Sequence, residues 1–488
     1  MNPKSIAVVG ASRTPGRAGY VVVENVSRSY RGGRVFPVNP SAREILGLPC
    51  YPDLKSLPES PEIVVLSVPP DQILSAVDSA GTSGARGLVV IASGFAEEGG
   101  EGRALESEMV RRARAHGMRI LGPNTTGLLN LGKDLLLTFI PFDEVPRGSV
   151  SFVVQSGTFG GGLLEQIRSS YSFGISKSIG LGNKADLGDE EALRYLGDDG
   201  DTRVIAVHME GTKNGRTFFE SARDAARKKP LVLLKSGRTP FGAEAMLSHT
   251  ASLAGNDALF TAACRQAGII RVRDIEEFFD TIKAFAGQPL PRGNRVAVVT
   301  FSGAAGVMGA DVLYEEGMTL AALDPETIKT VRDAGPPWHR IGNPMDIWPT
   351  EMMIGYENAY TIGMRAALKD PQVDAVLVVH SAMPGNRMPV DTFSFFHRIH
   401  QEFPDKPMFS VLHGNRAAGE EIRVFLEKRG IPSYPSIDRA ARVLAHMHRY
   451  AARAAERYRL TFPPFGKGGQ GGFLPKAAHK IPAGKKGS

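Results

Sequence analysis

Residues 5–12 read SIAVVGAS, a short apolar run that ends in a glycine turn. The same order of residues returns at 149–157 (SVSFVVQSG) and at 295–303 (RVAVVTFSG). Continuous runs of Val, Ile and Leu are typical of parallel strands that are buried on both faces. In open α/β sheets a glycine turn after such a strand leads into a helix. Each stretch therefore predicts the first strand, turn and helix of one α/β unit.

Further apolar runs lie at 62–68, 87–94, 204–210, 230–237, 374–380 and 407–414. Helix-length segments such as 104–115 and 325–334 separate them, and this alternation predicts βαβ units. The fold class is therefore α/β, with three successive doubly wound (Rossmann/flavodoxin-like) parallel-sheet domains.

Two breaks divide the chain into those domains. One is the polar, proline-containing stretch at 142–148, and the other is the Pro- and Gly-rich stretch at 287–294. We expect domains at 1–145, 146–288 and 292–460. From 461 to 488 the chain holds seven Gly, four Pro and five Lys, which cannot build a core, so we expect a flexible basic tail.

The composition argues against several classes of protein. Of 488 residues, 42% are hydrophobic and 22% charged, a globular balance. The net charge is +7, but the five Lys of 461–488 leave only +2 for the body, so a nucleic-acid partner is not indicated. Cys50 and Cys264 have no disulfide-framework or metal-ligand spacing. No stretch reaches the ~18 apolar residues of a membrane span, and no signal-peptide pattern opens the chain, so we expect a cytoplasmic protein.

The turn at 10–19, GASRTPGRAG, predicts a phosphate site, although a tight strand-to-helix turn also needs glycine for steric reasons. The loops after the other strands of this domain would meet at the same sheet edge, where open α/β folds bind ligands. The second strand ends in VFPVNP at 35–40, without the acidic residue that holds the ribose of NAD. A phosphate-bearing nucleotide other than NAD therefore fits this edge. Its candidate residues are Gly10, Ala11, Ser12, Arg13, Gly16, Gly19, Val38, Asn39, Pro40, Val68, Pro69, Gly122, Pro123 and Asn124.

These motifs together resemble a known family. The runs at 10–19, 38–40 and 122–127 (GPNTTG) resemble the CoA-binding domain of the nucleoside-diphosphate-forming acyl-CoA synthetases, whose superfamily includes succinyl-CoA synthetase. The middle domain continues the match with LGNKADL at 181–187 and KSGRTPFGAEAMLSHTASLAGND at 235–257. The runs at 295–311 and 342–347 (GNPMDI) are similar to the extra domain of the ADP-forming acetyl-CoA synthetase α subunit. The resemblance implies a CoA-binding domain, a phosphohistidine ligase domain and a third, flavodoxin-type domain.

The resemblance implies two catalytic residues, His249 and Glu210. A neutral imidazole is a competent nucleophile toward an activated phosphoryl group, and His249 lies among small residues that we expect to form a loop before a helix. In the family this histidine becomes phosphorylated. Glu210 ends an apolar strand and would orient the ring by accepting its other N–H. From the residues alone, the alternatives are an ordinary core or surface histidine for His249 and a solvent-facing strand end for Glu210.

The turn at 155–158 predicts a second anion site, formed by Gln155, Ser156, Gly157 and Thr158. Free N–H groups at a helix start attract phosphate, and the two hydroxyls add donors. The alternative is a helix cap with nothing bound, since Ser and Thr are good caps. In the family this helix start stabilises the transferred phosphoryl group.

The third domain repeats the strand–glycine–helix pattern at 302–306 but has no histidine in the turn. The tetrapeptide at 343–346 offers potential ligands, although packing or subunit contact is the favoured role of this domain. Two positions depart from the family pattern: Ala251 replaces a glycine, and Ala304 replaces the second glycine of an SGG run.

We therefore expect the α subunit of an ADP-forming acyl-CoA synthetase, with CoA, acyl-CoA or carboxylic acid, and phosphate as its ligands. No ATP-grasp-like region is recognisable, so we expect ATP, ADP and Mg²⁺ to bind a separate ATP-grasp β subunit in a hetero-oligomer. The alternative is a non-catalytic CoA-binding regulatory or scaffold protein.

Overall fold

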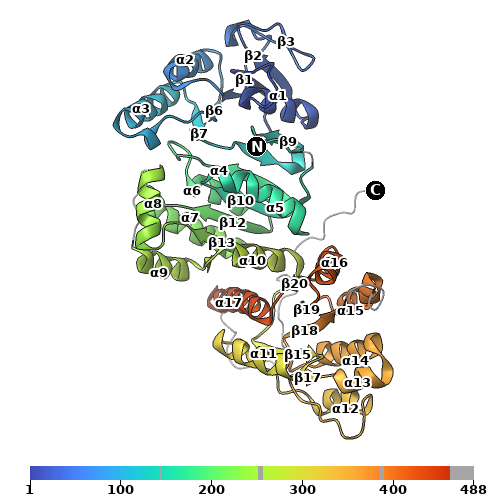
Figure 1. The fold of residues 1–488 in the computed structure, drawn as a ribbon. Helices are drawn as coiled ribbons and strands as arrows, with labels where there is room; N and C mark the ends of the chain where they lie inside the picture. Colours follow the sequence, from blue (N-terminus) through green and yellow to red (C-terminus); the bar gives the residue numbers. More distant parts are fainter. Residues whose placement is uncertain (143, 251–255, 384–388, 462–488) are drawn as a thin grey trace.

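The computed structural model describes residues 1–142, 144–250, 256–383 and 389–461, and places them in three stacked units, each with its own sheet (Figure 1). Every apolar run singled out in the sequence forms a strand. The predicted α/β class with successive parallel sheets is confirmed. The predicted tail lies outside the described residues except for Thr461, which ends the last helix.

The first unit has a parallel sheet in the order β2-β1-β5-β6-β7. Its strands are β1 (Ser5–Val9), β2 (Arg34–Val38), β5 (Ile63–Leu66), β6 (Gly87–Val90) and β7 (Arg119–Leu121). Its helices are α1 (Ala18–Ser29), α2 (Ile73–Thr82) and α3 (Gly100–Ala115). The chain leaves β1 toward β2 but leaves β5 toward β6. The winding therefore reverses between β1 and β5, and a ligand crevice is expected at their carboxyl ends.

The middle unit has the strand order β14-β13-β12-β10-β11-β8-β9. Its parallel strands are β10 (Arg147–Val154), β11 (Ile175–Gly180), β12 (Val204–Met209), β13 (Leu231–Lys235) and β14 (Ile270–Val272). Its helices are α4 (Gly157–Gly160), α5 (Gly162–Ser170), α6 (Asp189–Asp198), α7 (Gly215–Lys228), α8 (Pro240–Thr250), α9 (Asp257–Ala267) and α10 (Ile275–Gly287). Here the winding reverses between β10 and β12.

Two short strands of the middle sheet come from the expected first domain. β8 (Leu128–Asn130) pairs antiparallel with β11, and β9 (Leu135–Leu137) pairs with β8. The chain crosses from the first sheet to the middle sheet just after Gly127. The boundary expected near 145 therefore lies after β8 and β9, on the C-terminal side of this crossing. The polar, proline-containing break at 142–148 was visible in the sequence, whereas the sheet that β8 and β9 would join was not.

The third unit has the strand order β16-β15-β18-β19-β20, with β17 also paired to β15. Its strands are β15 (Arg295–Thr300), β16 (Thr319–Leu320), β17 (Met345–Asp346), β18 (Ala375–Ala382), β19 (Met408–Gly414) and β20 (Ser433–Tyr434). Its helices are α11 (Gly303–Glu315), α12 (Pro325–Asp333), α13 (Trp348–Ile354), α14 (Tyr356–Lys369), α15 (Ser394–Glu402), α16 (Arg416–Glu427) and α17 (Ile437–Thr461).

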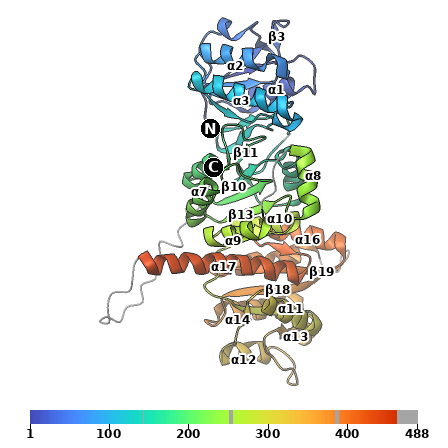
Figure 2. The same ribbon diagram turned by 90° about the vertical axis from the view of Figure 1, so that its left-hand side faces the viewer.

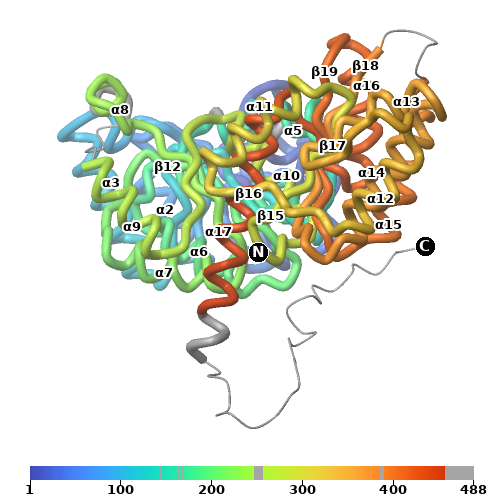
Figure 3. Tube along the Cα trace, turned by 90° about the horizontal axis from the view of Figure 1, so that it is seen from below, coloured from blue at the N-terminus to red at the C-terminus, as the bar shows by residue number. Residues whose placement is uncertain are grey.

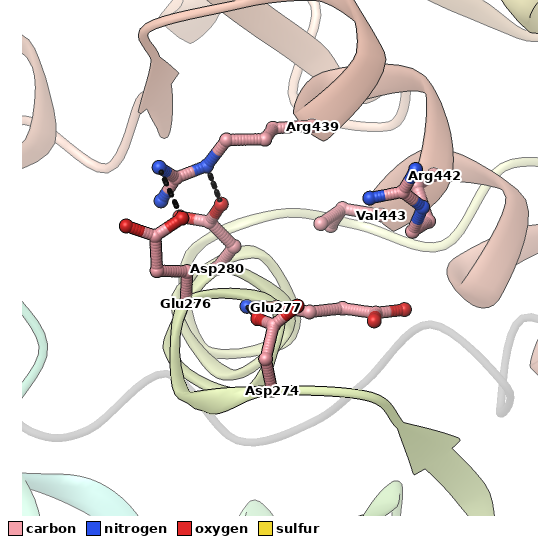
Figure 4. A pocket seen from close by; sticks show the side chains of 7 residues that line it. All are labelled: Asp274, Glu276, Glu277, Asp280, Arg439, Arg442 and Val443. Atoms are coloured by element: carbon pink, nitrogen blue, oxygen red, sulfur yellow. Dashed lines mark hydrogen bonds and ion pairs between the residues drawn. The ribbon is translucent and has the colours of Figure 1, made fainter.

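The last helix, α17, joins the third unit to the middle one. It lies across their boundary (Figure 2) and packs against α10 and α11, as the view from below also shows (Figure 3). Arg439 of α17 pairs with Asp280 at 2.6 Å and Glu276 at 3.2 Å, both on α10, beside a cavity of about 40 Å³ (Figure 4). One hydrophobic core runs through both units.

Within the described ranges, no helix combines the length and apolar content that a membrane crossing requires.

Candidate active site

The glycine turn of the first unit lies at its crevice between β1 and β5. Gly10 has φ +84°, and a Cβ there would lie 2.2 Å from the carbonyl oxygen of Ser67. A Cβ on Gly19 would lie 2.1 Å from the carbonyl oxygen of Gly10. The turn therefore has room only for glycine at these two positions, and its backbone is free to approach a ligand.

Most other predicted residues of this edge follow the ends of β1, β2 and β5. Asn39 donates from Nδ2 to the carbonyl of Ala11 at 2.7 Å, which ties the end of β2 to the glycine turn. Arg13 and Gly16 are exposed, and a Cβ on Gly16 would meet nothing. Ala11 and Val38 are buried supports, Ser12 and Val68 are half-buried, and Pro40 and Pro69 are exposed.

The loop at 122–124 faces the middle unit. Asn124 has φ +56° and is exposed, whereas Gly122 and Pro123 are buried. The backbone N–H of Asn183 donates to the carbonyl of Pro123 at 2.9 Å, and Asn124 Nδ2 donates to Asn183 Oδ1 at 3.4 Å. The N–H of Leu181 donates to the carbonyl of Val154, at the end of β10, at 2.8 Å. Residues 181–183 therefore connect the 122–124 loop of the first unit to the crevice of the middle unit.

Gln155 and Glu210 meet in that second crevice. Gln155 follows β10 and Glu210 follows β12, which are neighbours in the sheet. Gln155 Oε1 accepts the backbone N–H of Glu210 at 3.0 Å, and Gln155 Nε2 donates to Glu210 Oε2 at 3.4 Å. The Glu210 side chain thus has a fixed place at the position where the winding reverses, and the residue is only 7% exposed.

The turn after Gln155 differs from an ordinary cap. Ser156 makes no side-chain capping hydrogen bond to α4, whereas Ser302 in the third unit accepts the N–H of Ala305 and caps α11. The hydroxyl of Ser156 therefore remains available. Helix α4 has four residues, so its dipole contributes less than the sequence suggested. The side chain of Thr158 lies outside the described residues.

His249 belongs to the last turn of α8, not to a loop before a helix as expected. Pro240 and Gly242 lie in the first turn of α8, and the following sequence AEAMLSHT contains good helix formers and no Gly or Pro. The segment 251–255 lies outside the described residues. The side chain of His249 also lies outside them. Helix α8 stands beside the middle sheet (Figure 1) and contacts the turn Ala96–Glu98 of the first unit. The predicted phosphoryl acceptor is therefore carried by a helix that reaches both units.

Two buried lysines next to Glu210 were not singled out in the sequence. Lys235 ends β13 and donates to the carbonyls of Glu210 at 3.0 Å and Ser236 at 2.8 Å. Burial lowers the pKa of Lys235. Lys184 pairs with Asp189 at 2.7 Å and donates to the carbonyl of Gly211 at 3.0 Å. A lysine at the end of a buried apolar strand was the signal that could have identified Lys235.

In the third unit, the strand position equivalent to Glu210 carries a serine and not a carboxylate. β15 and β18 pair with Thr300 opposite Val379, so the position in register with Glu210 is Ser381. The predicted ligand Asn343 is occupied: its Nδ2 donates to two backbone carbonyls and its Oδ1 accepts the N–H of Val298. Asn343 therefore has a structural role. In the described part of the chain, no group of His, Cys, Asp and Glu is placed to hold a metal ion.

Three family models match the chain in succession. They describe a CoA binding domain at 4–130, a succinyl-CoA ligase like flavodoxin domain at 147–285 and a ligase-CoA domain at 296–469.

Several characterised proteins are similar over most of the chain. The α subunit of acetate–CoA ligase (ADP-forming) II from Pyrococcus furiosus is 36% identical and covers 89% of this chain and 93% of its own. Acetate–CoA ligase (ADP-forming) II from Archaeoglobus fulgidus is 38% identical over 92% of this chain, which spans only 66% of that longer relative. A solved structure of the acetyl-coenzyme A synthetase 1 of Ca. Korarchaeum cryptofilum, with phosphate and ADP, is 36% identical, with TM-score 0.86 over 94% of this chain and 98% of that one.

Proposed function

The chain belongs to the ADP-forming acyl-CoA synthetases, and we propose that it acts as the α subunit of such an enzyme. The complete reaction interconverts acyl-CoA, ADP and phosphate with a carboxylic acid, ATP and CoA. The observation that carries this proposal is the hydrogen-bonded pair Gln155–Glu210 at the reversal point of the middle sheet, connected to the CoA-binding unit through Asn183.

The first step would take place between the first two units. An oxygen of inorganic phosphate attacks the thioester carbonyl, the C–S bond breaks, and CoA leaves as a thiol after protonation. The turn at 155–158 would hold the phosphate through backbone N–H groups and the hydroxyl of Ser156, a form of electrostatic stabilisation. The product is an acyl phosphate.

The second step would transfer the phosphoryl group to His249. A ring nitrogen attacks phosphorus, the P–O bond to the acyl group breaks, and the carboxylate leaves. Glu210 would accept the N–H of the other ring nitrogen, which fixes the tautomer and stabilises the cationic ring that forms. The phosphoryl group then passes from His249 to ADP, with positioning and charge stabilisation supplying most of the catalysis.

CoA rather than NADH should bind the first unit. The turn at 10–19 suits phosphate, and β2 ends without an acidic residue for a ribose. Titration calorimetry should therefore detect CoA binding. Arg13→Ala should weaken it by about 10- to 100-fold, because a charge-assisted contact to phosphate is worth about 1.5–3 kcal/mol and each 1.4 kcal/mol is a factor of ten. Arg31→Ala, beyond the other end of α1, is the matched control and should bind normally. NADH binding without CoA binding would contradict the assignment.

A separate subunit should supply the nucleotide site. We propose an ATP-grasp β subunit that binds ADP or ATP with Mg²⁺, because two relatives that this chain matches over 93% and 96% of their own length are named as α subunits. The purified chain should accept label from acetyl-CoA and radioactive phosphate but form no ATP when ADP and Mg²⁺ are added. ATP should form only after the partner isolated from the source cell is supplied. ATP synthesis by the chain alone would contradict this part of the proposal.

A further inference from the structure

His208 lies next to the proposed phosphoryl site, which is formed by Glu210 and the 155–158 turn, but it has no chemical role in the steps proposed above. It is on β12, two residues before Glu210, and only 2% exposed. Its ring stacks face to face on Phe159 of α4, with centroids 3.6 Å apart and planes 8° from parallel. Phe159 also packs against the core that the middle and third units share.

His208 also contacts two other segments that border Glu210. Its Nε2 lies 2.9 Å from the hydroxyl of Ser236, the residue after β13. Its backbone carbonyl accepts the N–H of Gln155 at 3.2 Å. The ring and the backbone carbonyl of His208 therefore connect α4, the end of β13 and the start of the 155–158 turn.

The ring does not act as an acid or base here. Burial, together with the nearby charge of Lys184, lowers the pKa of His208 to about 3, so the ring is neutral at ordinary pH. Nδ1 is buried and has no hydrogen-bond partner among the described residues. The ring therefore acts through its shape and through its stacking on Phe159.

Helix α4 needs such external support. Its four residues, GTFG, form a single turn, and two more glycines follow. Glycine lowers helix stability by roughly 0.8–1.0 kcal/mol relative to alanine, and one isolated turn is unstable in water. Phe159 is the only large side chain in the turn, so its contacts decide where the turn lies.

We propose that His208 is a positioning residue for phosphoryl transfer: its ring holds Phe159, and through it the 155–158 turn, in register with Glu210. The proposal rests on the proposed function for the reaction it serves, but its structural part can be tested separately.

Two substitutions separate stacking from hydrogen bonding. His208→Phe retains a flat ring over Phe159 and loses the bond to Ser236, whereas His208→Gln retains a polar group and loses the ring. In the chain with its partner, His208→Gln should slow labelling of His249 by about 10²-fold, the cost of a misplacement near 1 Å. KM for phosphate should rise while CoA affinity stays unchanged. His208→Phe should recover most of the rate.

The third unit provides a matched control. His380 on β18 is also buried, its Nε2 lies 2.7 Å from Ser410 on β19, and its pKa is likewise lowered to about 3 by burial. Its ring contacts Phe393 and Phe396, far from the proposed site in the fold. His380→Gln should lower the melting temperature as His208→Gln does, but leave the labelling rate within about twofold of the parent, because it removes packing and not positioning.

Hydrogen exchange gives a readout that needs no activity. In His208→Gln, amides of 155–162 should exchange faster, while they stay protected in His208→Phe and His380→Gln. The proposal is overturned if His208→Phe is as slow as His208→Gln, if His380→Gln slows labelling equally, or if exchange at 155–162 is unchanged in His208→Gln. If exchange behaves as expected but the parent chain takes no label, the proposed function has failed instead.

Discussion

His249→Ala should abolish phosphorylation of the chain. Incubation with acetyl-CoA and labelled phosphate, with the partner subunit present, should give the parent a label that is lost in acid and stable in base. Acid lability is expected because protonation of a phosphoimidazole makes it a good leaving group. The alanine variant has no nucleophile at this position, so no label should form. A label that survives in His249→Ala would show that another residue is the acceptor.

Glu210→Gln tests the orienting carboxylate in the same assay. Glutamine keeps the shape and can still accept the hydrogen bond from Gln155, but it removes the charge that would stabilise a cationic ring. We expect labelling to slow about 10²-fold. Glu220→Gln on α7, where the glutamate is exposed, is the control and should label at the parent rate. Equal rates in both variants would remove Glu210 from the mechanism.

Lys184→Met should destabilise the middle unit severely. The Lys184 and Asp189 side chains are 4% and 2% exposed, and the ammonium contacts both carboxylate oxygens at 2.7 Å. Removing one partner leaves a buried charge without compensation, which costs about 3–5 kcal/mol. The bond to the Gly211 carbonyl is lost as well. Calorimetry should show a large fall in the unfolding midpoint of the transition that includes the middle unit.

The same helix supplies the control for that experiment. Asp198 at the other end of α6 pairs with Lys228, but both side chains are at least half exposed. Lys228→Met should therefore leave the midpoint nearly unchanged, since surface pairs contribute little. Lys184→Met with Asp189→Asn should recover part of the lost stability, because no buried charge then remains. Equal midpoints for Lys184→Met and Lys228→Met would contradict the importance of the buried pair.

The sequence predicted strands where residues were uniformly apolar, and failed where a buried strand carried polar groups. β11 reads ISKSIG, and no apolar run marks it. Its Lys177 is 2% exposed in the structure because Asp199 and Asp201 accept its ammonium. Those acids follow α6, more than twenty residues later, so a local pattern contained no sign that this lysine would be neutralised and buried.

The candidate site shows the same limit. Gln155 and Glu210 were each chosen from the sequence, since both follow a predicted strand. Their hydrogen bond depends on β12 lying next to β10, with β11 on the other side. Strand order is a property of the whole sheet, and no spacing between motifs encodes it. His208 was overlooked for a related reason: a histidine inside an apolar run looks like core until its neighbour Phe159 is known.

β8 and β9 also matter for how such a protein can be assembled from parts. They leave the first unit and close the edge of the middle sheet beside β11, whose backbone groups would otherwise be open to another strand. A middle unit without β8 and β9 would expose the unpaired backbone groups of β11 and would tend to aggregate through that strand. The first two units therefore cannot be exchanged between related proteins by cutting at the boundary near 145. A recombinant protein would have to keep β8 and β9 together with the middle sheet that they complete.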